Sequence, residues 1–521
     1  DLPFFMLFGL FFMVFSARRR VLRFFPLIAA VALLATFSCN DKSGSSHQNN
    51  TPSCFDDKDC SGISCPSDEV SLCIASACEC VNDISWGIPG PHSSVAVIGQ
   101  YAWVASYNAT YGDLMIAKTI PGVNEPATIK PDDWAFIDGV PAGPVVLPTS
   151  DVRGGINTPG EDVGSYTSIG ALNTTTPIVA HHNYDTGSMR ITYTADGTNY
   201  ISYDVDNGGD PQSGDFGNAG LFNDLKIRGS DSHPTVVYMV NNIPGTTSLV
   251  SEVRYAQATV PVPASAADWT YVTVASREYP YPEVDEVLGD WPEGTGLFAS
   301  QDHFVDNSVA VAWYDQYDGN LKLSWQSEPG GDFVEPVVVV EKTTTGIPMG
   351  LFATMAIDPE DENIIHFVYQ DGMQRSLFYS TYDITTGEAV ESIIDDGFRE
   401  DDGLNQNGLP MPVQHYFGAD CSIKIAATKV FVSWQDATTQ ELYFAILDRT
   451  EAVPDWQVTI LGGNEEPYEG SIGFYLDMEI MGTNLYLSTY GVNLHAERDI
   501  LGNPALYYFV NVYSIPTGIV E

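Results

Sequence analysis

The chain has 521 residues, of which 68 are acidic and 22 basic, giving a formal net charge of −46. So acidic a surface repels nucleic acid and anionic lipid, and no basic stripe offsets it, so we exclude DNA and RNA as partners. The acidity can instead serve cation binding, cationic partners or solubility. Abundant Gly, Pro, Tyr and Phe favour short strands and turns over helices.

Residues 1–38 have the features of a secretory signal. Three consecutive basic residues, Arg18, Arg19 and Arg20, precede an apolar stretch that ends just before Cys39. Met13 is the candidate start of translation, which would leave residues 1–12 untranslated. We therefore expect an exported protein.

Cys39 follows apolar and small residues and precedes a polar run. This pattern resembles a bacterial lipoprotein signal, in which the first mature cysteine carries the lipid; ordinary cleavage nearby is the alternative. We expect a lipid anchor at Cys39, a flexible tether over residues 39–53 and a location at the outer cell surface or in the periplasm. The lipid is then the only contact with the membrane.

Residues 54–80 are rich in cysteine. Six closely spaced cysteines in an exported chain predict a disulfide-rich mini-domain too small to have its own core. A zinc site is the alternative, although no histidine is interleaved. The pairing stays open among Cys54, Cys60, Cys65, Cys73, Cys78 and Cys80. The remaining Cys421 lies in an apolar strand and is expected to be a buried small hydrophobe.

An alternating apolar strand followed by a polar turn and a second strand recurs along the rest of the chain. A small polar or acidic residue precedes each of these hairpins. The hairpin landmarks are Tyr107, His182, Met239, Tyr314, Tyr369, Trp434 and Tyr490. The polar residues are Ser94, Ser168, Asp224, Ser300, Thr354, Asp420 and Asp477. The spacings in the two series agree within one residue, which indicates seven repeats.

An acidic residue and an aromatic residue begin a further apolar stretch at Asp133, Asp268, Asp332 and Asp455. These stretches supply a fourth strand in each repeat. The fold class is therefore all-β: a seven-bladed β-propeller of four-stranded antiparallel blades over residues 81–521, preceded by the small disulfide-rich segment. Residues 81–86 are the predicted fourth strand of the last blade, which would close the ring and remove an exposed edge.

One repeat carries a resemblance to a known group of proteins. It reads Gly-Ser-Tyr-Thr-Ser-Ile at residues 164–169, then Pro-Ile-Val-Ala-His-His-Asn at 177–183 and Gly-Ser-Met-Arg at 187–190. This resembles the blades of secreted bacterial lipoproteins and propellers of the sialidase-like superfamily. The resemblance concerns the fold alone. The Ser-x-Asp-x-Gly-x-x-Trp boxes and the arginine triad of true sialidases have no counterpart, so no catalytic residue is carried over.

The first strand of each propeller blade lines the central channel, so the seven polar residues are predicted to converge near the channel mouth. They can bind sugar hydroxyls or a cation such as Ca²⁺, or they can hold neighbouring backbones together. Two residues earlier, Tyr166 and Tyr475 can stack on sugars or fill the space between blades. His415, just before Asp420, is a candidate acid, base or metal ligand.

From these features we predict a non-catalytic cell-surface binding module that presents a propeller face to a glycan, matrix or protein partner. The first alternative is a carbohydrate-active enzyme, a hydrolase or lyase, that uses the channel carboxylates. The second is a structural component of an envelope assembly. We expect a monomer with a glycan or surface protein as partner. No cofactor is assigned, and Ca²⁺ is the one candidate.

Overall fold

The computed structural model describes residues 69–74, 77–82 and 87–518, apart from 124, 131–132, 141, 146–152, 154–155, 173–174, 210–216, 230, 245–247, 281–293, 405–408, 452–454, 464–469 and 499–503. The chain divides into one unit of residues 1–83 and 282–293 and a second of residues 84–281 and 294–521. The predicted signal, the anchor Cys39, the tether, and Cys54, Cys60 and Cys65 lie outside the described residues.

The described part of the first unit is a hairpin. Strands β1 (Glu69–Ile74) and β2 (Ala77–Asn82) pair antiparallel, with Cys73 opposite Cys78 in the register. The predicted disulfides stay a prediction.

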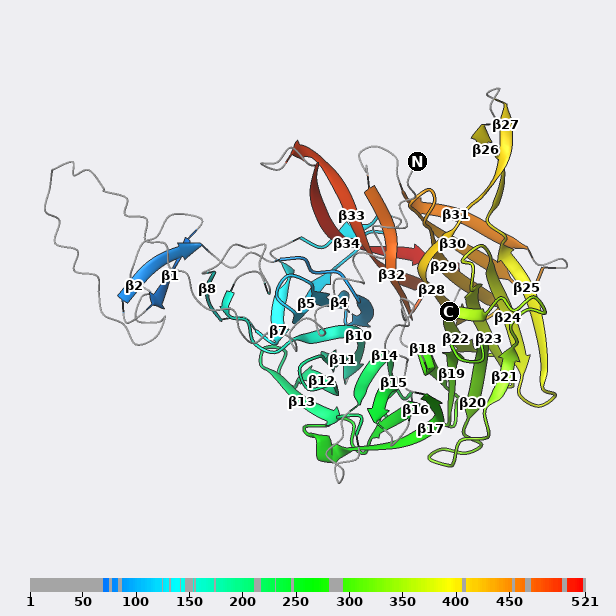
Figure 1. Cartoon of the computed structure of the whole chain (residues 1–521), viewed down its shortest axis with the longest axis horizontal. Helices are drawn as coiled ribbons and strands as arrows, with labels where there is room; N and C mark the ends of the chain where they lie inside the picture. Colours follow the sequence, from blue (N-terminus) through cyan, green and yellow to red (C-terminus); the bar gives the residue numbers. More distant parts are fainter. Residues whose placement is uncertain are drawn as a thin grey trace, which may run out of the picture. The chain divides into compact units, whose positions relative to one another are not determined.

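The second unit is built of seven four-stranded antiparallel sheets, which confirms the all-β propeller (Figure 1). Each sheet is one blade. Blade 1 is β3 (Ser94–Ile98), β4 (Tyr101–Asn108), β5 (Asp113–Thr119) and β7 (Ala135–Asp138); blade 2 is β10 (Val163–Leu172), β11 (Thr176–Asn183), β12 (Ser188–Thr194) and β13 (Tyr200–Asp206); blade 3 is β14 (Asn218–Ile227), β15 (Pro234–Pro244), β16 (Ser248–Ala258) and β17 (Trp269–Pro280).

The remaining blades follow in chain order. Blade 4 is β18 (Thr295–His303), β19 (Val309–Asp315), β20 (Asn320–Trp325) and β21 (Val337–Val340); blade 5 is β22 (Met349–Ile357), β23 (Ile364–Asp371), β24 (Leu377–Asp383) and β25 (Glu388–Asp395); blade 6 is β28 (Phe417–Ala426), β29 (Lys429–Asp436), β30 (Glu441–Asp448) and β31 (Trp456–Gly462); blade 7 is β32 (Gly470–Met481), β33 (Asn484–Arg498), β34 (Pro504–Pro516) and β6 (Ala127–Thr128). Two further hairpins, β8 (Ala142–Val145) with β9 (Ile156–Thr158) and β26 (Phe398–Leu404) with β27 (Pro410–Gln414), lie in the connections between blades.

Burial falls from the second strand of a blade to the fourth. All seven residues of β19 are buried, whereas β25 is exposed over most of its length. The second strand is covered on both faces by neighbouring blades, so it reads as a continuous apolar run rather than an alternating one. Apolar clusters accordingly join neighbouring blades, with Trp313 buried between blades 3 and 4. Large buried side chains of this kind each contribute about 1.5–3 kcal/mol of hydrophobic stabilisation.

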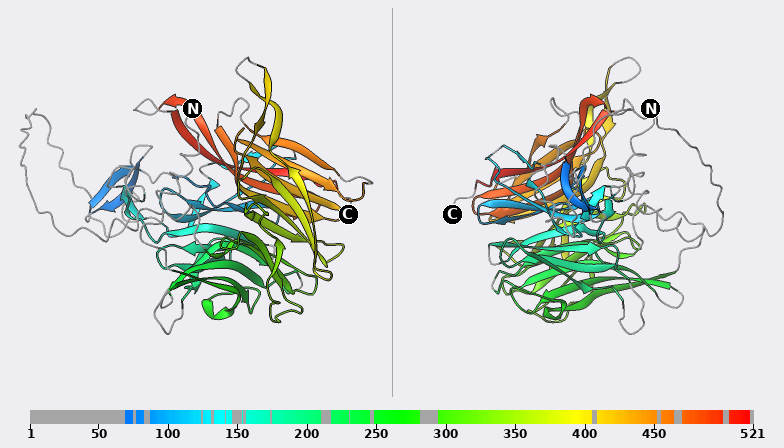
Figure 2. Two further views of the ribbon diagram at one scale, coloured as in Figure 1. Left: turned by 45° about the vertical axis from the view of Figure 1, so that its right-hand side comes forward. Right: turned by 90° about the vertical axis from the view of Figure 1, so that its left-hand side faces the viewer.

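The last blade is closed by a segment other than the predicted one. Strand β6 pairs with β34 through Thr128–Asn511 and Ala127–Val512. Val81 and Asn82, which we expected to close the ring, pair instead with β1. The predicted closing strand, residues 81–86, is therefore wrong: the closing strand lies in the sequence between β5 and β7 of blade 1. A pairing of two residues leaves no periodic pattern in the sequence. Figure 2 shows the strands at the C-terminal end of the chain, in red, beside the blue and cyan strands of blade 1, and one apolar cluster joins blades 7 and 1.

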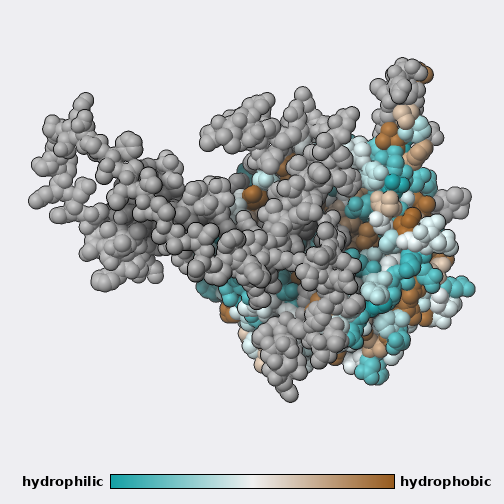
Figure 3. Space-filling view, viewed as in Figure 1, coloured by the Kyte–Doolittle hydropathy of each residue, from teal (hydrophilic) through white to brown (hydrophobic). Residues whose placement is uncertain are grey.

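The predicted outer strands are largely confirmed. Trp269 begins β17 and Trp456 begins β31, while Phe333 forms an isolated bridge with Gln326 ahead of β21. Hydrophilic and hydrophobic residues are interspersed on the coloured surface in Figure 3. No helix in the described ranges is long and apolar enough to cross a membrane.

Candidate functional site

The first strands of the seven blades surround a cavity of about 400 Å³. It is lined by the predicted residues Ser94, Ser168, Asp224, Ser300, Thr354, Asp420, Asp477, Tyr166 and Tyr475. The structure therefore brings nine of the ten predicted binding residues to one cavity. The tenth, His415, does not line it: this side chain is 2% exposed and its Nδ1 lies 2.7 Å from Oδ2 of Asp436.

Most of the polar residues connect one blade to the next. The side chain on one first strand accepts a hydrogen bond from a backbone N–H on the following first strand. The bonds are Ile169 N–H to Ser94 Oγ at 3.3 Å, Leu225 N–H to Ser168 Oγ at 2.8 Å, Gln301 N–H to Asp224 Oδ2 at 2.8 Å, Met355 N–H to Ser300 Oγ at 3.3 Å and Val95 N–H to Asp477 Oδ2 at 2.9 Å. We call this arrangement the latch belt.

The latch belt satisfies a structural need. The first strand is an edge strand, and its N–H groups facing the channel lack a partner within their own blade. A buried N–H left unpaired costs about 1–3 kcal/mol. Asp477 closes the ring of blades, because Oδ2 also accepts the hydroxyl of Ser94 at 2.6 Å. For these five positions the observed bonds fit the backbone-holding interpretation of the polar residues.

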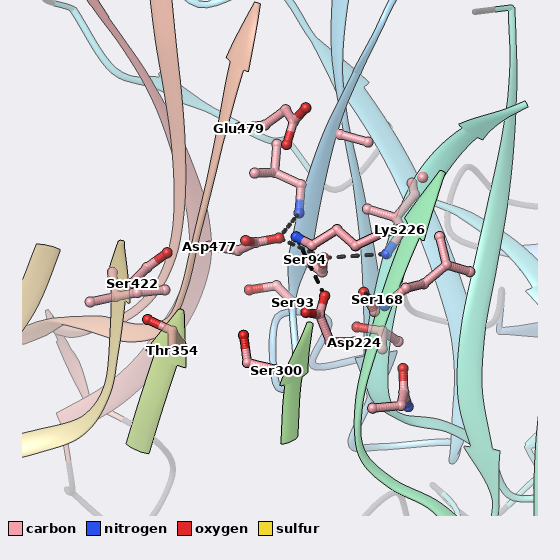
Figure 4. Close-up of a pocket in the computed structure, with 18 of the residues that line it drawn as sticks. Ser93, Ser94, Ser168, Asp224, Lys226, Ser300, Thr354, Ser422, Asp477 and Glu479 are labelled. Atoms are coloured by element: carbon pink, nitrogen blue, oxygen red, sulfur yellow. Dashed lines mark hydrogen bonds and ion pairs between the residues drawn. The ribbon is translucent and has the colours of Figure 1, made fainter. Parts of the chain in front are cut away.

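The belt is open at blades 5 and 6. The hydroxyl oxygen of Thr354 is fully buried and has no hydrogen-bond partner among the residues that the structure describes. The next belt position is Ser422, which lies beside the cavity, is 6% exposed and makes no hydrogen bond to a described residue. The N–H of Met478, which a latch at Ser422 would engage, bonds to Oδ1 of Asp477 instead. Figure 4 shows Thr354 and Ser422 next to each other, across the cavity from Asp224 and Lys226.

Six aromatic rings lie next to the belt, each two residues before a belt residue in the sequence. We call them the aromatic collar. Consecutive rings have centroids 4.6 to 5.0 Å apart in the order Tyr475, His92, Tyr166, Phe222, Phe298 and Phe352. All six residues have positive φ, between 47° and 56°. Burial lowers the pKa of His92 to about 4, so its ring is neutral near pH 7.

Asp420 occupies the seventh position of this collar. Its φ is also positive, at 88°, and it lies two residues before Ser422. From its residue type, Asp420 was predicted to belong to the polar series. In the structure Ser422 holds that position, two residues further along the chain. An acidic side chain fits the polar pattern by type, which explains the error. Aspartate also tolerates a left-handed backbone better than most residues do.

A glycine in the repeat reveals the true register. The pattern Gly-x-aromatic-x-polar recurs from Gly90, Gly164, Gly220, Gly296, Gly350 and Gly473, and its sixth copy is Gly418-Ala-Asp-Cys-Ser. At Gly164, φ is +100° and an added Cβ would lie 2.9 Å from Cα of Leu114 in the preceding blade. The glycine therefore lets neighbouring blades approach closely. Aligning these glycines identifies Ser422, which sequence reasoning missed.

The polar character at blade 6 extends outward from the collar. Tyr107, His182, Tyr314 and Tyr490 form a second ring, with centroids 6.2 to 6.5 Å from the collar rings. In blades 5 and 6 this position holds the buried residues Gln370 and Gln435. Gln370 donates to the carbonyl of Gly418 at 2.8 Å, and its own amide oxygen is buried without a partner.

Asp420 is a carboxylate of the cavity wall with an unused oxygen. Its Oδ2 accepts the N–H of Tyr475 at 2.9 Å, and it forms no ion pair with a described residue. Burial raises the pKa of Asp420 from 3.8 to about 6, and the Tyr475 N–H partly opposes this rise. We call Thr354, Asp420 and Ser422 the open side of the cavity.

Charged residues follow the belt residues by two positions in several of the first strands. Lys226 lies 3.5 Å from Asp224, and Lys424 lies 3.5 Å from Glu479. Burial raises the pKa of Asp224, and Lys226 opposes that rise; the carboxylates around Lys226 hold its own pKa above the ordinary value despite burial. The two lysines thus each have a carboxylate partner and do not neutralise the open side.

The metal interpretation gains no support from this geometry. Across the described part of the chain, no group of three or more His, Cys, Asp or Glu side chains is placed to hold a metal ion.

The prediction that Cys421 is a buried small hydrophobe is confirmed. The residue is 2% exposed, and its thiol donates to the carbonyl of Phe352 at 3.0 Å.

No protein-family model matches the chain, and no curated protein is similar to it. Solved structures are similar at low identity. An α-L-arabinanase of Penicillium chrysogenum complexed with arabinobiose is 12% identical, with a TM-score of 0.39, covering 68% of this chain and 94% of that one. The subtype N11 neuraminidase-like protein of a flat-faced bat strain is 9% identical, with a TM-score of 0.34 and coverage of 84% of this chain and 91% of that one. An exo-β-1,3-galactanase of Phanerochaete chrysosporium is 8% identical, with a TM-score of 0.32 and coverage of 84% and 90%. The fold assignment rests on the strand pairing, and these similarities decide nothing about activity.

Proposed function

We propose that the axial cavity binds the end of a glycan through its open side. The observation that carries this proposal is the pair Asp420 and Ser422, two neighbouring polar side chains on the cavity wall with unused hydrogen-bonding capacity. Buried polar groups are normally paired, so unused acceptors on this part of the wall favour a ligand that completes them. On the latched side the belt side chains already accept backbone N–H groups.

A sugar suits both kinds of wall. Its hydroxyls donate and accept hydrogen bonds, which matches a hydroxyl and a carboxylate, and its C–H surfaces can pack against the aromatic collar. A cavity of about 400 Å³ lies within the size range of small-ligand sites. The names of two of the solved structures above include a carbohydrate ligand or bond, but TM-scores below 0.4 carry no substrate to this chain.

The test measures binding of neutral and charged oligosaccharides to the full chain by calorimetry. Ser422→Ala removes an unpaired hydroxyl on the cavity wall and should weaken binding about fivefold, the effect of one hydrogen bond. Ser300→Ala is the matched control, because Ser300 is a latched belt residue; its dissociation constant should stay within about twofold. Absence of binding to every oligosaccharide would refute the proposal.

Glycoside hydrolysis is the second candidate, and the raised pKa of Asp420 favours it. A carboxylic acid with a pKa of about 6 can remain protonated close to neutral pH and donate its proton to a leaving oxygen. Incubation with the same oligosaccharides, followed by mass spectrometry of newly formed reducing ends, separates the two functions. Products that disappear in Asp420→Asn would make the protein a hydrolase, whereas retained ligand without products supports binding alone.

We also propose display at the cell surface through a lipid on Cys39, on the strength of the sequence pattern alone. Cys39→Ser should move the protein from the membrane fraction to the soluble exported fraction and abolish incorporation of labelled fatty acid. Retention of the variant in the membrane fraction would refute the anchor.

A further inference from the structure

The charges of the cavity point to a particular kind of ligand group. Its two lysines, Lys226 and Lys424, each have a carboxylate partner at 3.5 Å. Asp477 is held by Ser94 and two backbone N–H groups, and Asp420 by the Tyr475 N–H. The cavity therefore has more carboxylates than cations, in a chain whose net charge is −46. Such a site attracts positive charge and disfavours an anionic ligand.

The open side offers the cavity two acceptors without a proton donor from a described side chain: the second carboxylate oxygen of Asp420 and the hydroxyl oxygen of Ser422. The hydroxyl oxygen of Thr354 also lacks a partner among the described residues, but it is fully buried. Asp420 and Ser422 both belong to β28, and both line the cavity. Thr354 is on β22, the first strand of the neighbouring blade.

Ser422 is an observation independent of the carboxylate. It is 6% exposed, lines the cavity and has no partner among the described residues, although the equivalent hydroxyls Ser94, Ser168 and Ser300 each accept a backbone N–H. A buried hydroxyl that gives up the bond made by its equivalents is expected to have another partner. Figure 4 shows it directed toward the cavity beside Thr354.

We propose that the open side binds a primary ammonium group, so that the ligand is an amino sugar with an unacylated amine. An ammonium group has three N–H donors and no acceptor, so it can donate to both the carboxylate oxygen of Asp420 and the hydroxyl oxygen of Ser422. The carboxylate supplies a charge-assisted hydrogen bond, which is about twice as strong as a neutral one. The proposal rests on the proposed glycan binding and specifies its ligand class.

Chitosan and chitin tetramers provide a matched pair of probes, because they share the sugar backbone and differ in the free or acetylated amine. Calorimetry with the full chain near pH 6 should show the glucosamine tetramer binding about tenfold more tightly, the effect of one charge-assisted hydrogen bond. Asp420→Asn should abolish that preference. Asparagine keeps an acceptor for the Tyr475 N–H and tolerates positive φ, so this variant is expected to fold.

Asp302→Asn is the control for a general loss of negative charge in the channel. Asp302 lies on β18 outside the cavity lining, and it accepts the N–H of Ile357 at 2.8 Å. This variant should keep the preference for the amine. Equal binding of the two tetramers would refute the ammonium site and leave glycan binding intact. A preference that survives Asp420→Asn would also refute the site. Failure of both tetramers and of all other oligosaccharides to bind would refute the proposed function and this inference together.

Discussion

The two sides of the channel wall use the same residue types for different purposes. On blades 7, 1, 2, 3 and 4, serine and aspartate side chains accept backbone N–H groups of the next blade, and the aromatic collar is continuous. On blades 5 and 6, Thr354 and Ser422 make no such bond, and Asp420 replaces an aromatic ring. The comparison shows that the belt bonds between blades are concentrated on one side, and that the belt residues on the other side keep their hydrogen-bonding capacity unused.

The largest expected effect contrasts a latch with an open position. Asp477→Ala removes the acceptor of the Val95 N–H and the Ser94 hydroxyl, and with it the bond that joins the last blade to the first. It should lower the free energy of unfolding by about 3 kcal/mol, because buried donors lose their partner. Ser422→Ala should change it by less than about 0.5 kcal/mol. Urea unfolding of both variants checks this, and equal losses would erase the distinction between the two sides.

Asp420 is expected to weaken the fold when it is ionised. Its pKa is raised to about 6 in the folded chain, so between about pH 4 and pH 6 the unfolded state loses the proton first. The stability contributed by this group therefore falls as the pH rises through that window. Asp420→Asn should raise the free energy of unfolding by about 2 kcal/mol near pH 8 and leave it nearly unchanged near pH 4.

The measurement is the difference in unfolding free energy between wild type and Asp420→Asn across this pH range. A constant difference would mean that burial does not penalise the carboxylate. A gain near pH 8 together with loss of ligand binding would show that the open side sacrifices stability for recognition.

The aspartate also marks the interruption of the collar, and replacing it by an aromatic residue tests that role. Asp420→Tyr gives blade 6 the residue type of Tyr166 and Tyr475, which already adopt positive φ. We expect oligosaccharide binding to weaken at least about tenfold, because the charge-assisted bond is lost. Unchanged binding in a variant that unfolds normally would place the ligand elsewhere.

The smallest expected effect concerns the weaker latches. Ser300 accepts the Met355 N–H at 3.3 Å, a long hydrogen bond, so Ser300→Ala should lower stability by about 1 kcal/mol. Thr354→Val, one blade further on, should be neutral or slightly stabilising, because it replaces an unpaired buried hydroxyl by a methyl group. A larger loss for Thr354→Val than for Ser300→Ala would contradict the assignment of the open side.

The sequence predicts the seven blades because their apolar hairpins and polar first-strand residues recur with matching spacing. It also predicts that Ser94, Ser168, Asp224, Ser300 and Asp477 converge. It places Asp420 two residues out of register, because an aspartate satisfies the polar pattern and conceals the missing aromatic residue. The recurring glycine that starts at Gly90 contains the correction, and it reflects a close contact between blades that the polar pattern does not record.

The division into a latched and an open side is not visible in the sequence. Ser94 and Ser422 are the same residue type at the same place in the repeat, and they differ in whether a neighbouring N–H is available. That availability depends on the next blade, where the carboxylate of Asp477 takes the N–H of Met478. The closing strand β6 was missed for a related reason, since its two residues are defined only by their partners on β34.

The most direct test of the central claim is a structure of the full chain with a bound glucosamine oligosaccharide. We predict an amine nitrogen within hydrogen-bonding distance of Asp420 and Ser422, with the latch bonds of Ser94 and Ser168 unchanged. A sugar bound in the cavity against the latched side, or on the outer surface of the propeller with the cavity empty, would contradict the account.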